Sequence, residues 1–140
     1  MLLEKATQYA EDCISGKEIT TPEVIQQCKW FLSDREKEND ESFPYRFHEE
    51  KLKVIEGILK LLNFATGFVS GSIYNGLSLY QIFLIANIFG WRFKNDESRF
   101  RYRKVDLFIP RKNAKTFDAA LIVIILMLTE PNYSTDAYRR

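Results

Sequence analysis

The chain has 140 residues, of which 46% are hydrophobic and 14% aromatic, and 20 basic side chains against 19 acidic ones give a net charge of +1. This composition is enough for one globular domain with a filled core, and the near-neutral charge excludes attraction to nucleic acid or anionic lipid by an overall field. Cys13 and Cys28 have no Cys-x-x-Cys spacing and no histidine cluster, so we predict reduced core thiols instead of disulfides or a metal site. Glu4 and Lys5 interrupt the apolar start, and the longest apolar run is about half a membrane span, so we expect a cytosolic protein.

The first forty residues predict two helices. Leu3 to Ser15 carries apolar residues at a spacing of three and four, and Gly16 is placed to end that helix. Thr21 is a good N-cap before Pro22 at the first helical position, so a second helix begins there. We expect this helix to lose its regular structure in the charged run Ser33 to Glu41, which we interpret as a frayed helix end and a loop.

The middle of the chain predicts a third helix between irregular segments. Proline makes Phe43 to Tyr45 extended. His48 is the only histidine, and because no nucleophile or second ligand accompanies it, we interpret it as the residue that precedes a helix from Glu49 to about Phe64. Glycines then indicate a long loop with a short strand at Phe68 and Val69.

A strongly apolar helix from Leu79 to Phe89 follows, and Gly90 is placed to end it. Gln81 stands near its start, where a side-chain amide could face a ligand or could simply be an exposed helix residue. Trp91 to Phe93 and Phe100 to Ile109 flank a polar turn, which makes a hairpin or strand pair plausible.

The stretch after this hairpin has the layout of a phosphate-binding loop. Val105 to Ile109 reads as a strand that Pro110 ends, and Ala119 to Leu128 is an apolar run of the length of a buried helix. Backbone N–H groups at the start of such a helix attract polyphosphate. The positive charge of Lys115 would contact the β- and γ-phosphates, and the hydroxyl of Thr116 would contact magnesium. The alternative is a positively charged turn that caps a core helix.

Basic residues gather in the same stretch. Between Arg99 and Lys115 there are seven basic residues and one acidic residue, Asp106. Phosphates are the obvious partner for such a run. The alternative is an edge strand protected from aggregation by its charge.

With these residues in view, the chain resembles the N-terminal part of a phage terminase large subunit, the ATP-driven motor that packages DNA into procapsids. The resemblance covers roughly Tyr9 to Ser134 and rests on the segments YAEDCISGKE, FHEEKLKVIE, LYQIFLIANIFGWR and, above all, FRYRKVDLFIPRKNAKT. It implies a helix-rich α/β fold with a helical, lid-like region over residues 1–76. Residues 77–140 would hold the first strand, phosphate-binding loop and helix of an incomplete P-loop NTPase domain.

The resemblance also implies a site and its ligands, ATP and Mg²⁺. Gln81 is then the candidate adenine-sensing glutamine, and Arg111 is a candidate for stabilising the charge on the transferring phosphoryl group. The phosphate loop consists of Arg111, Lys112, Asn113, Ala114, Lys115 and Thr116. In the full-length family the partners are double-stranded DNA, the small terminase subunit and the portal, in the cytoplasm of the bacterial host and with no membrane.

The chain departs from the family at two points. Ala114 stands where the family usually has glycine, and its β-carbon could crowd the phosphates. Hydrolysis also needs an apolar strand that ends in Asp-Glu, whereas the pairs at residues 40–41 and 96–97 follow polar turns. We therefore expect a fragment, or a truncated reading frame of a prophage, that binds nucleotide weakly without turnover. Because its apolar last helix lacks cover, we expect self-association, poor solubility or a swapped arrangement. The alternative is a non-catalytic, mostly helical phage binding module that contacts phosphate or another phage protein.

Overall fold

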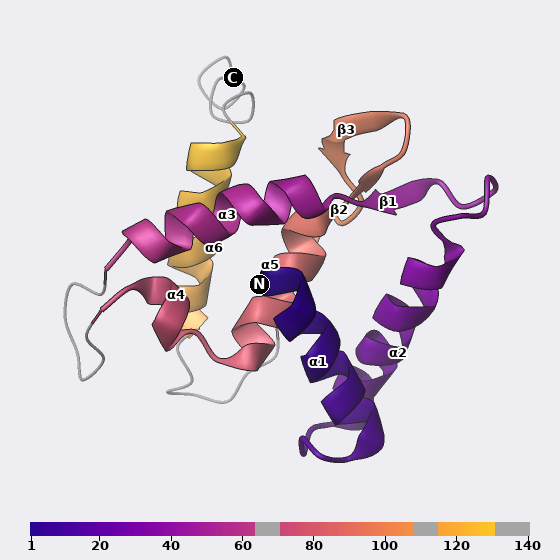
Figure 1. Ribbon diagram of the computed structural model, residues 1–140, viewed down its shortest axis with the longest axis horizontal. Coiled ribbons are helices and arrows are strands. Elements are labelled where there is room, and N and C mark those ends of the chain that lie inside the picture. Colours follow the sequence, from indigo (N-terminus) through magenta and orange to yellow (C-terminus); the bar gives the residue numbers. More distant parts are fainter. Residues whose placement is uncertain (64–70, 108–114, 131–140) are drawn as a thin grey trace.

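The computed structural model describes residues 1–63, 71–107 and 115–130. In chain order its elements are α1 (Leu2–Ser15), α2 (Pro22–Lys37), β1 (Tyr45–Phe47), α3 (Glu49–Leu61), α4 (Ile73–Gly76), α5 (Leu79–Gly90), β2 (Trp91–Phe93), β3 (Asp96–Phe100) and α6 (Lys115–Thr129) (Figure 1). The protein is therefore helix-rich α/β, as predicted. Among the described helices, none combines the length and the apolar character that crossing a bilayer requires.

The two N-terminal helices form because of the capping residues that the sequence indicated. Gly16 adopts a left-handed φ of 85° after α1, and Thr21 Oγ1 accepts a hydrogen bond of 3.3 Å from the backbone N–H of Val24 at the start of α2. The expectation that Ser33 to Glu41 is a frayed end was wrong for its first half, because α2 continues to Lys37.

Ion pairs explain this longer helix, one of them local and two of them with residues farther along the chain. Asp34 is buried and its carboxylate lies 2.7 Å from the guanidinium of Arg101, while Arg35 contacts Glu38 at 3.0 Å and Glu49 at 3.7 Å. Charged side chains that look like a solvated loop in the sequence thus have partners in the fold.

The strands form one antiparallel sheet in the order β1-β2-β3. β1 pairs with β2 in a register that places Tyr45 opposite Phe93 and Phe47 opposite Trp91. The predicted hairpin after α5 is present, although its second strand begins at Asp96, inside the predicted turn.

The strand predicted at Val105 to Ile109 is not formed in the described part of that range. Val105 to Leu107 belongs to no strand, and Val105 and Leu107 are 45% and 38% exposed; Phe108 and Ile109 lie outside the described residues. A strand needs a neighbour for its backbone N–H and C=O groups. In the described sheet β2 pairs with β1 and β3, and Val105 to Leu107 pairs with the outer edge of neither β1 nor β3.

The core centres on α5, which packs against α1 and lies near α3 (Figure 1). Aromatic side chains join the helices to the sheet, since the ring of Phe31 contacts the rings of Phe47, Phe83 and Trp91 at centroid distances of 5.8, 5.4 and 6.5 Å. Cys13 and Cys28 are buried and free, as predicted. Burial, followed by the neighbouring Cys13, raises the pKa of Cys28 to about 12.

Two smaller expectations also change. The third helix ends at Leu61 instead of near Phe64, and the predicted loop contains the short helix α4; the strand expected at Phe68 and Val69 lies outside the described residues.

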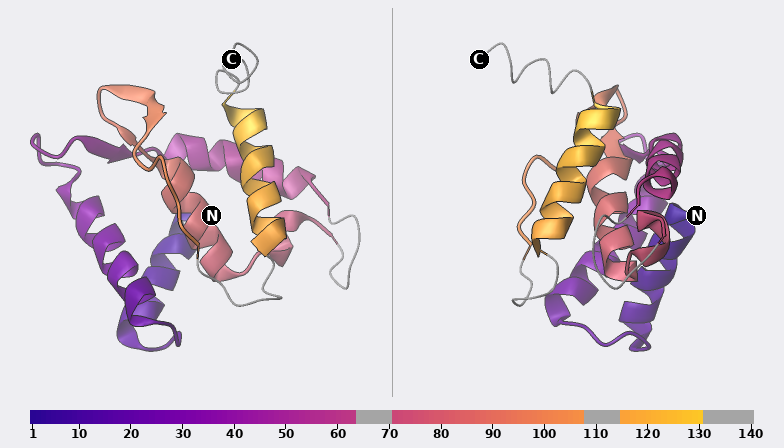
Figure 2. Two further views of the ribbon diagram at one scale, coloured as in Figure 1. Left: turned by 180° about the vertical axis from the view of Figure 1, so that it is seen from behind. Right: turned by 90° about the vertical axis from the view of Figure 1, so that its left-hand side faces the viewer.

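The last helix is confirmed, since α6 contains the whole apolar run that begins at Ala119. Figure 2 shows α6 beside α5 on the outer side of the molecule.

Candidate functional site

The predicted phosphate loop is described only at its end. Arg111, Lys112, Asn113 and Ala114 lie outside the described residues. Lys115 is the first residue of α6, and the Thr116 side chain next to it is exposed. The helix that would present its N-terminal amides to phosphate therefore begins where the sequence indicated.

Gln81 lies at this helix start, although it is 37 residues away from Asp118 in the sequence. Its Nε2 donates a hydrogen bond of 2.6 Å to Asp118 Oδ1, and the hydroxyl of Tyr80 lies 3.4 Å from Asp118 Oδ2. Its Oε1 accepts hydrogen bonds of 2.9 and 3.0 Å from the backbone N–H and the hydroxyl of Ser78. The N-terminal turns of α5 and α6 are thereby held together by one polar cluster, Ser78, Tyr80, Gln81 and Asp118, which we call the helix-start cluster.

This arrangement overturns the expectation that Gln81 would be an exposed helix residue by default, since the side chain is only 8% exposed. Asp118 is buried at 4% and lies in the first turn of α6, where a carboxylate is favoured by the positive end of the helix dipole. Burial, then the charge and hydrogen bond of Asp118, raises the pKa of Tyr80.

The start of α6 has backbone donors that attract phosphate, whereas the space beside Gln81 is too small for adenine. The first backbone N–H groups of a helix have no acceptor within the helix, and the exposed hydroxyl of Thr116 could reach a magnesium ion that accompanies a nucleotide. The oxygen of the Gln81 amide is already used by Ser78. The space between Gln81 and the adjacent apolar side chains of α5 and α6 is about 10 Å³, room for a single water and not for a purine ring.

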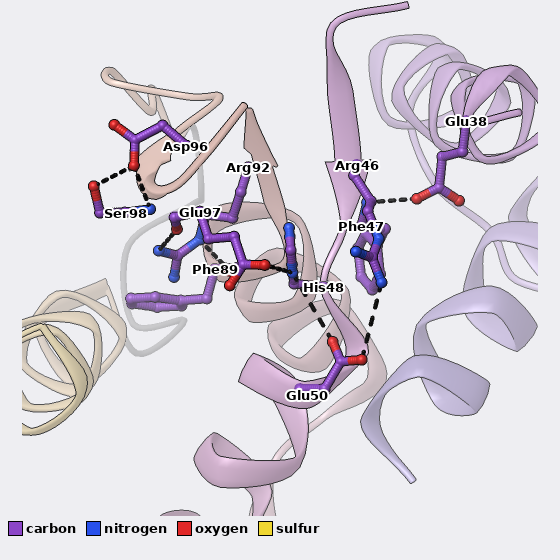
Figure 3. Close-up of polar contacts among 10 residues, drawn as sticks. All are labelled: Glu38, Arg46, Phe47, His48, Glu50, Phe89, Arg92, Asp96, Glu97 and Ser98. Atoms are coloured by element: carbon purple, nitrogen blue, oxygen red, sulfur yellow. Dashed lines mark hydrogen bonds and ion pairs between the residues drawn. The ribbon is translucent and has the colours of Figure 1, made fainter. Parts of the chain in front are cut away.

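A second polar cluster lies where β1 meets α3, around His48 (Figure 3). His48 occupies the N-cap position of α3, as interpreted from the sequence, and its side chain is 3% exposed. Its Nδ1 lies 3.9 Å from carboxylate oxygens of both Glu50 and Glu97, and its Nε2 is buried with no hydrogen-bond partner among the described residues. Burial lowers the pKa of His48 despite these two acids, which act in the opposite direction.

The described side chains around His48 are not arranged as a metal site. In the part of the chain that the structure describes, no three histidine, cysteine, aspartate or glutamate side chains are arranged to hold a metal ion. The neighbouring cations Arg46 and Arg92 make the surroundings a charge-balanced network (Figure 3).

The sequence analysis missed one buried arginine, Arg92, and one half-buried arginine, Arg101. Arg92 is 0% exposed; its guanidinium donates to the carbonyls of Phe89 and Glu97 and lies 2.9 Å from a carboxylate oxygen of Glu130. Arg101 pairs with Asp34, and four aromatic rings surround its guanidinium at 4.5 to 5.5 Å, those of Phe43, Tyr45, Trp91 and Tyr102. Arg101 therefore stabilises the fold. The basic run between Arg99 and Lys115 consequently has fewer exposed charges than its composition indicates.

Of the two acidic pairs that the sequence analysis considered for hydrolysis, the pair at residues 40–41 lies in a turn after α2, and the pair at residues 96–97 begins β3. Asp40 Oδ1 accepts hydrogen bonds from the backbone N–H and hydroxyl of Ser42, and Asp96 Oδ1 accepts the same pair from Ser98. Both carboxylates therefore cap local turns.

The fold and the site together define a helix-rich α/β protein with a small antiparallel sheet and a polar cluster at the start of its last helix. No family model, curated protein or solved structure matches the chain.

Proposed function

We propose that this chain is the nucleotide-binding part of a DNA-packaging motor of the phage terminase large-subunit type, and that it binds the phosphates of ATP or ADP at the N-terminus of α6. One observation carries the proposal: the hydrogen bond of 2.6 Å from Gln81 to Asp118 brings the glutamine of the resemblance to the first turn of that helix. Two residues that the resemblance assigns to one nucleotide site, Gln81 and Thr116, are thereby adjacent to the same helix end.

The phosphates would be bound mainly by backbone donors. The N-terminal turn of α6 and the positive end of the helix dipole attract them, Lys115 adds a charge, and the exposed Thr116 hydroxyl can contact magnesium. Magnesium supplies charge neutralisation between the β- and γ-phosphates. Asp118 acts against this attraction, because its carboxylate already occupies the positive end of the helix.

Affinity is therefore expected to be low. Gln81 can contact a base only after its bond to Asp118 opens, so part of the interaction energy is spent on breaking a buried hydrogen bond. Turnover is not expected, because the carboxylates of Asp40 and Asp96 are used in turns and no Asp-Glu strand end accompanies the helix in the described residues.

Calorimetry with Mg-ATP and Mg-ADP tests the proposal on four proteins: the unmodified chain, Lys115→Ala, Ala114→Gly and Lys104→Ala. Lys115→Ala should weaken binding by about ten- to a hundredfold, because a hydrogen bond to a charged group is worth about 1.5–3 kcal/mol. Ala114→Gly should leave the affinity unchanged or increase it. Lys104→Ala is the matched control, since that side chain is 84% exposed and lies outside the loop, and it should bind like the unmodified chain.

Equal affinity with and without Lys115 would show that the stretch is a basic turn. An equal loss in Lys115→Ala and Lys104→Ala would show that nucleotide binds through diffuse surface charge. Steady release of phosphate by the unmodified chain would contradict the expectation of no turnover.

The second candidate is a non-catalytic phage binding module. It is favoured by the hydrogen bond that holds Gln81 against Asp118, which leaves a space of only about 10 Å³ for a base among the described residues, and by the exposed apolar side of α6. The absence of any calorimetric response to nucleotide in all four proteins would select this candidate.

A further inference from the structure

The solvent-facing side of α6 is apolar from Ala119 onward. Every exposed residue of the helix after Thr116 is apolar, and these residues recur at a spacing of three and four: Ala119, Ala120, Val123, Ile124, Met127 and Leu128. The last four are 53%, 40%, 63% and 59% exposed. We call these six residues the α6 face.

The α6 face cannot turn inward by rotation of the helix. On the opposite side Leu121 and Ile125 are 3% and 0% exposed. At the first turn Asp118 accepts the hydrogen bond from Gln81, and just after the last turn Glu130 pairs with the buried Arg92 at 2.9 Å. Rotation would break both buried polar contacts, so the α6 face stays exposed in a single copy of the chain.

We propose that the α6 face packs against the α6 face of a second copy, with the two helices antiparallel. The residues vary in size along the helix, from alanines at its start through Val123 and Ile124 to Met127 and Leu128 at its end. A two-fold axis between positions 123 and 124 therefore sets the alanines of each copy opposite Met127 and Leu128 of the other. Small residues opposite large ones fill an interface, whereas a parallel pair would set large against large and leave a gap between the alanines.

Charge and geometry agree with this arrangement. The α6 face carries no charged side chain, so a symmetric pair brings no like charges together. Antiparallel helices also place opposite ends of their dipoles side by side. The spacing of Ala120, Ile124 and Met127 is the one by which helices pack at a shallow crossing angle.

The second copy is expected to bind weakly through α6 alone. A helix of this length spans about 22 Å, and its one face buries less than the roughly 800 Å² per partner of a standard interface. Val105 and Leu107, which are also exposed, lie in the segment that runs on the same side of the molecule as α6 and can extend the contact (Figure 2). We expect a reversible dimer with a dissociation constant on the order of tens of micromolar.

Sedimentation velocity from about 5 to about 500 µM, a range that brackets such a dissociation constant, tests the dimer on the whole chain. Val123→Glu places a charge beside the two-fold axis and should shift the protein to monomer over the whole range. Val54→Glu is the matched control, because Val54 is an exposed valine on α3 with nearly the same exposed fraction, 57% against 53%. It should dimerise like the unmodified chain. Circular dichroism of both variants verifies that each is folded.

Cross-linking distinguishes the orientation. Ala120→Cys mixed with Met127→Cys should give mixed disulfides faster than either variant alone, since antiparallel packing brings position 120 of one copy next to position 127 of the other. A monomer throughout the concentration range, equal dimerisation of Val123→Glu and Val54→Glu, growth beyond a dimer, or faster disulfides within each single variant would each overturn the proposal. The outcome is independent of nucleotide, so it stands or fails separately from the proposed function.

Discussion

Gly90 gives the sharpest test of the packing that places α5 against the sheet. It is the last residue of α5, and a β-carbon built there would lie 2.5 Å from Cζ and 2.6 Å from Cε2 of Phe47. Phe47 is 3% exposed, and its ring is held by the rings of Phe31 and Trp91 at 5.8 and 5.2 Å. Because the ring has little room to retreat, Gly90→Ala must displace the ring or the helix end.

The expected loss follows from overpacking, which costs about 1–3 kcal/mol in the free energy of unfolding. In a chain of this size that corresponds to a midpoint temperature lower by about 2–4 °C for each kcal/mol. Gly57 is the matched control, since it lies within α3 and a β-carbon there meets nothing within 4 Å. Gly57→Ala should stabilise the protein by up to about 1 kcal/mol through helix propensity alone.

Urea unfolding followed by circular dichroism measures both variants. The Phe47→Leu background supplies the decisive comparison, because leucine lacks the ring atoms Cζ and Cε2 that would clash, so Gly90→Ala should be less harmful there. Opposite shifts of the Gly90 and Gly57 variants, with coupling to Phe47, support the described packing. A Gly90→Ala protein as stable as the unmodified one, or a loss unchanged in the Phe47→Leu background, would refute it.

Two further predictions concern buried charge. Glu130→Ala leaves the guanidinium of Arg92 buried without its carboxylate and should lower the free energy of unfolding by about 3–5 kcal/mol in urea titrations, whereas Asp106→Ala, which removes the exposed partner of Lys104, should change it by less than about 1 kcal/mol. Equal effects of these two substitutions would contradict the burial of Arg92. The pKa of His48 is lowered in the fold by burial, so the unfolded chain binds a proton below about pH 6.5 while the folded one still does not. Stability should therefore fall as the pH drops below about 6.5, and His48→Asn should flatten that part of the profile; an unchanged profile would show that His48 does not titrate in this way.

Local chemistry was enough to predict most helices. Thr21 and Pro22 mark a helix start, Gly16 marks an end, and the apolar spacing of α1 and α5 specifies a buried side whatever the rest of the chain does. The reduced state of Cys13 and Cys28 also followed from their spacing alone.

Contacts between distant residues account for what the sequence could not predict. Gln81 looked like an exposed helix residue because its partner Asp118 is far along the chain, and Arg92 gave no sign of burial because Glu130 is 38 residues away. The charged end of α2 is helical for the same reason, since Asp34 pairs with Arg101. The missing strand at Val105 is a different case: strand-forming residues are present, but their described part, Val105 to Leu107, pairs with no strand of the described sheet.

The central claim is that nucleotide phosphates bind at the start of α6. Titration of the isotope-labelled chain with Mg-ADP, followed by amide NMR spectra, tests it most directly, because each backbone N–H of residues 115–117 and the side-chain amide of Gln81 gives its own signal. We predict that these signals shift together and saturate, and that those of the exposed Arg99 and Arg103 do not. Shifts confined to the segment 99–104, or no shift at the start of α6 at saturating nucleotide, would contradict the claim.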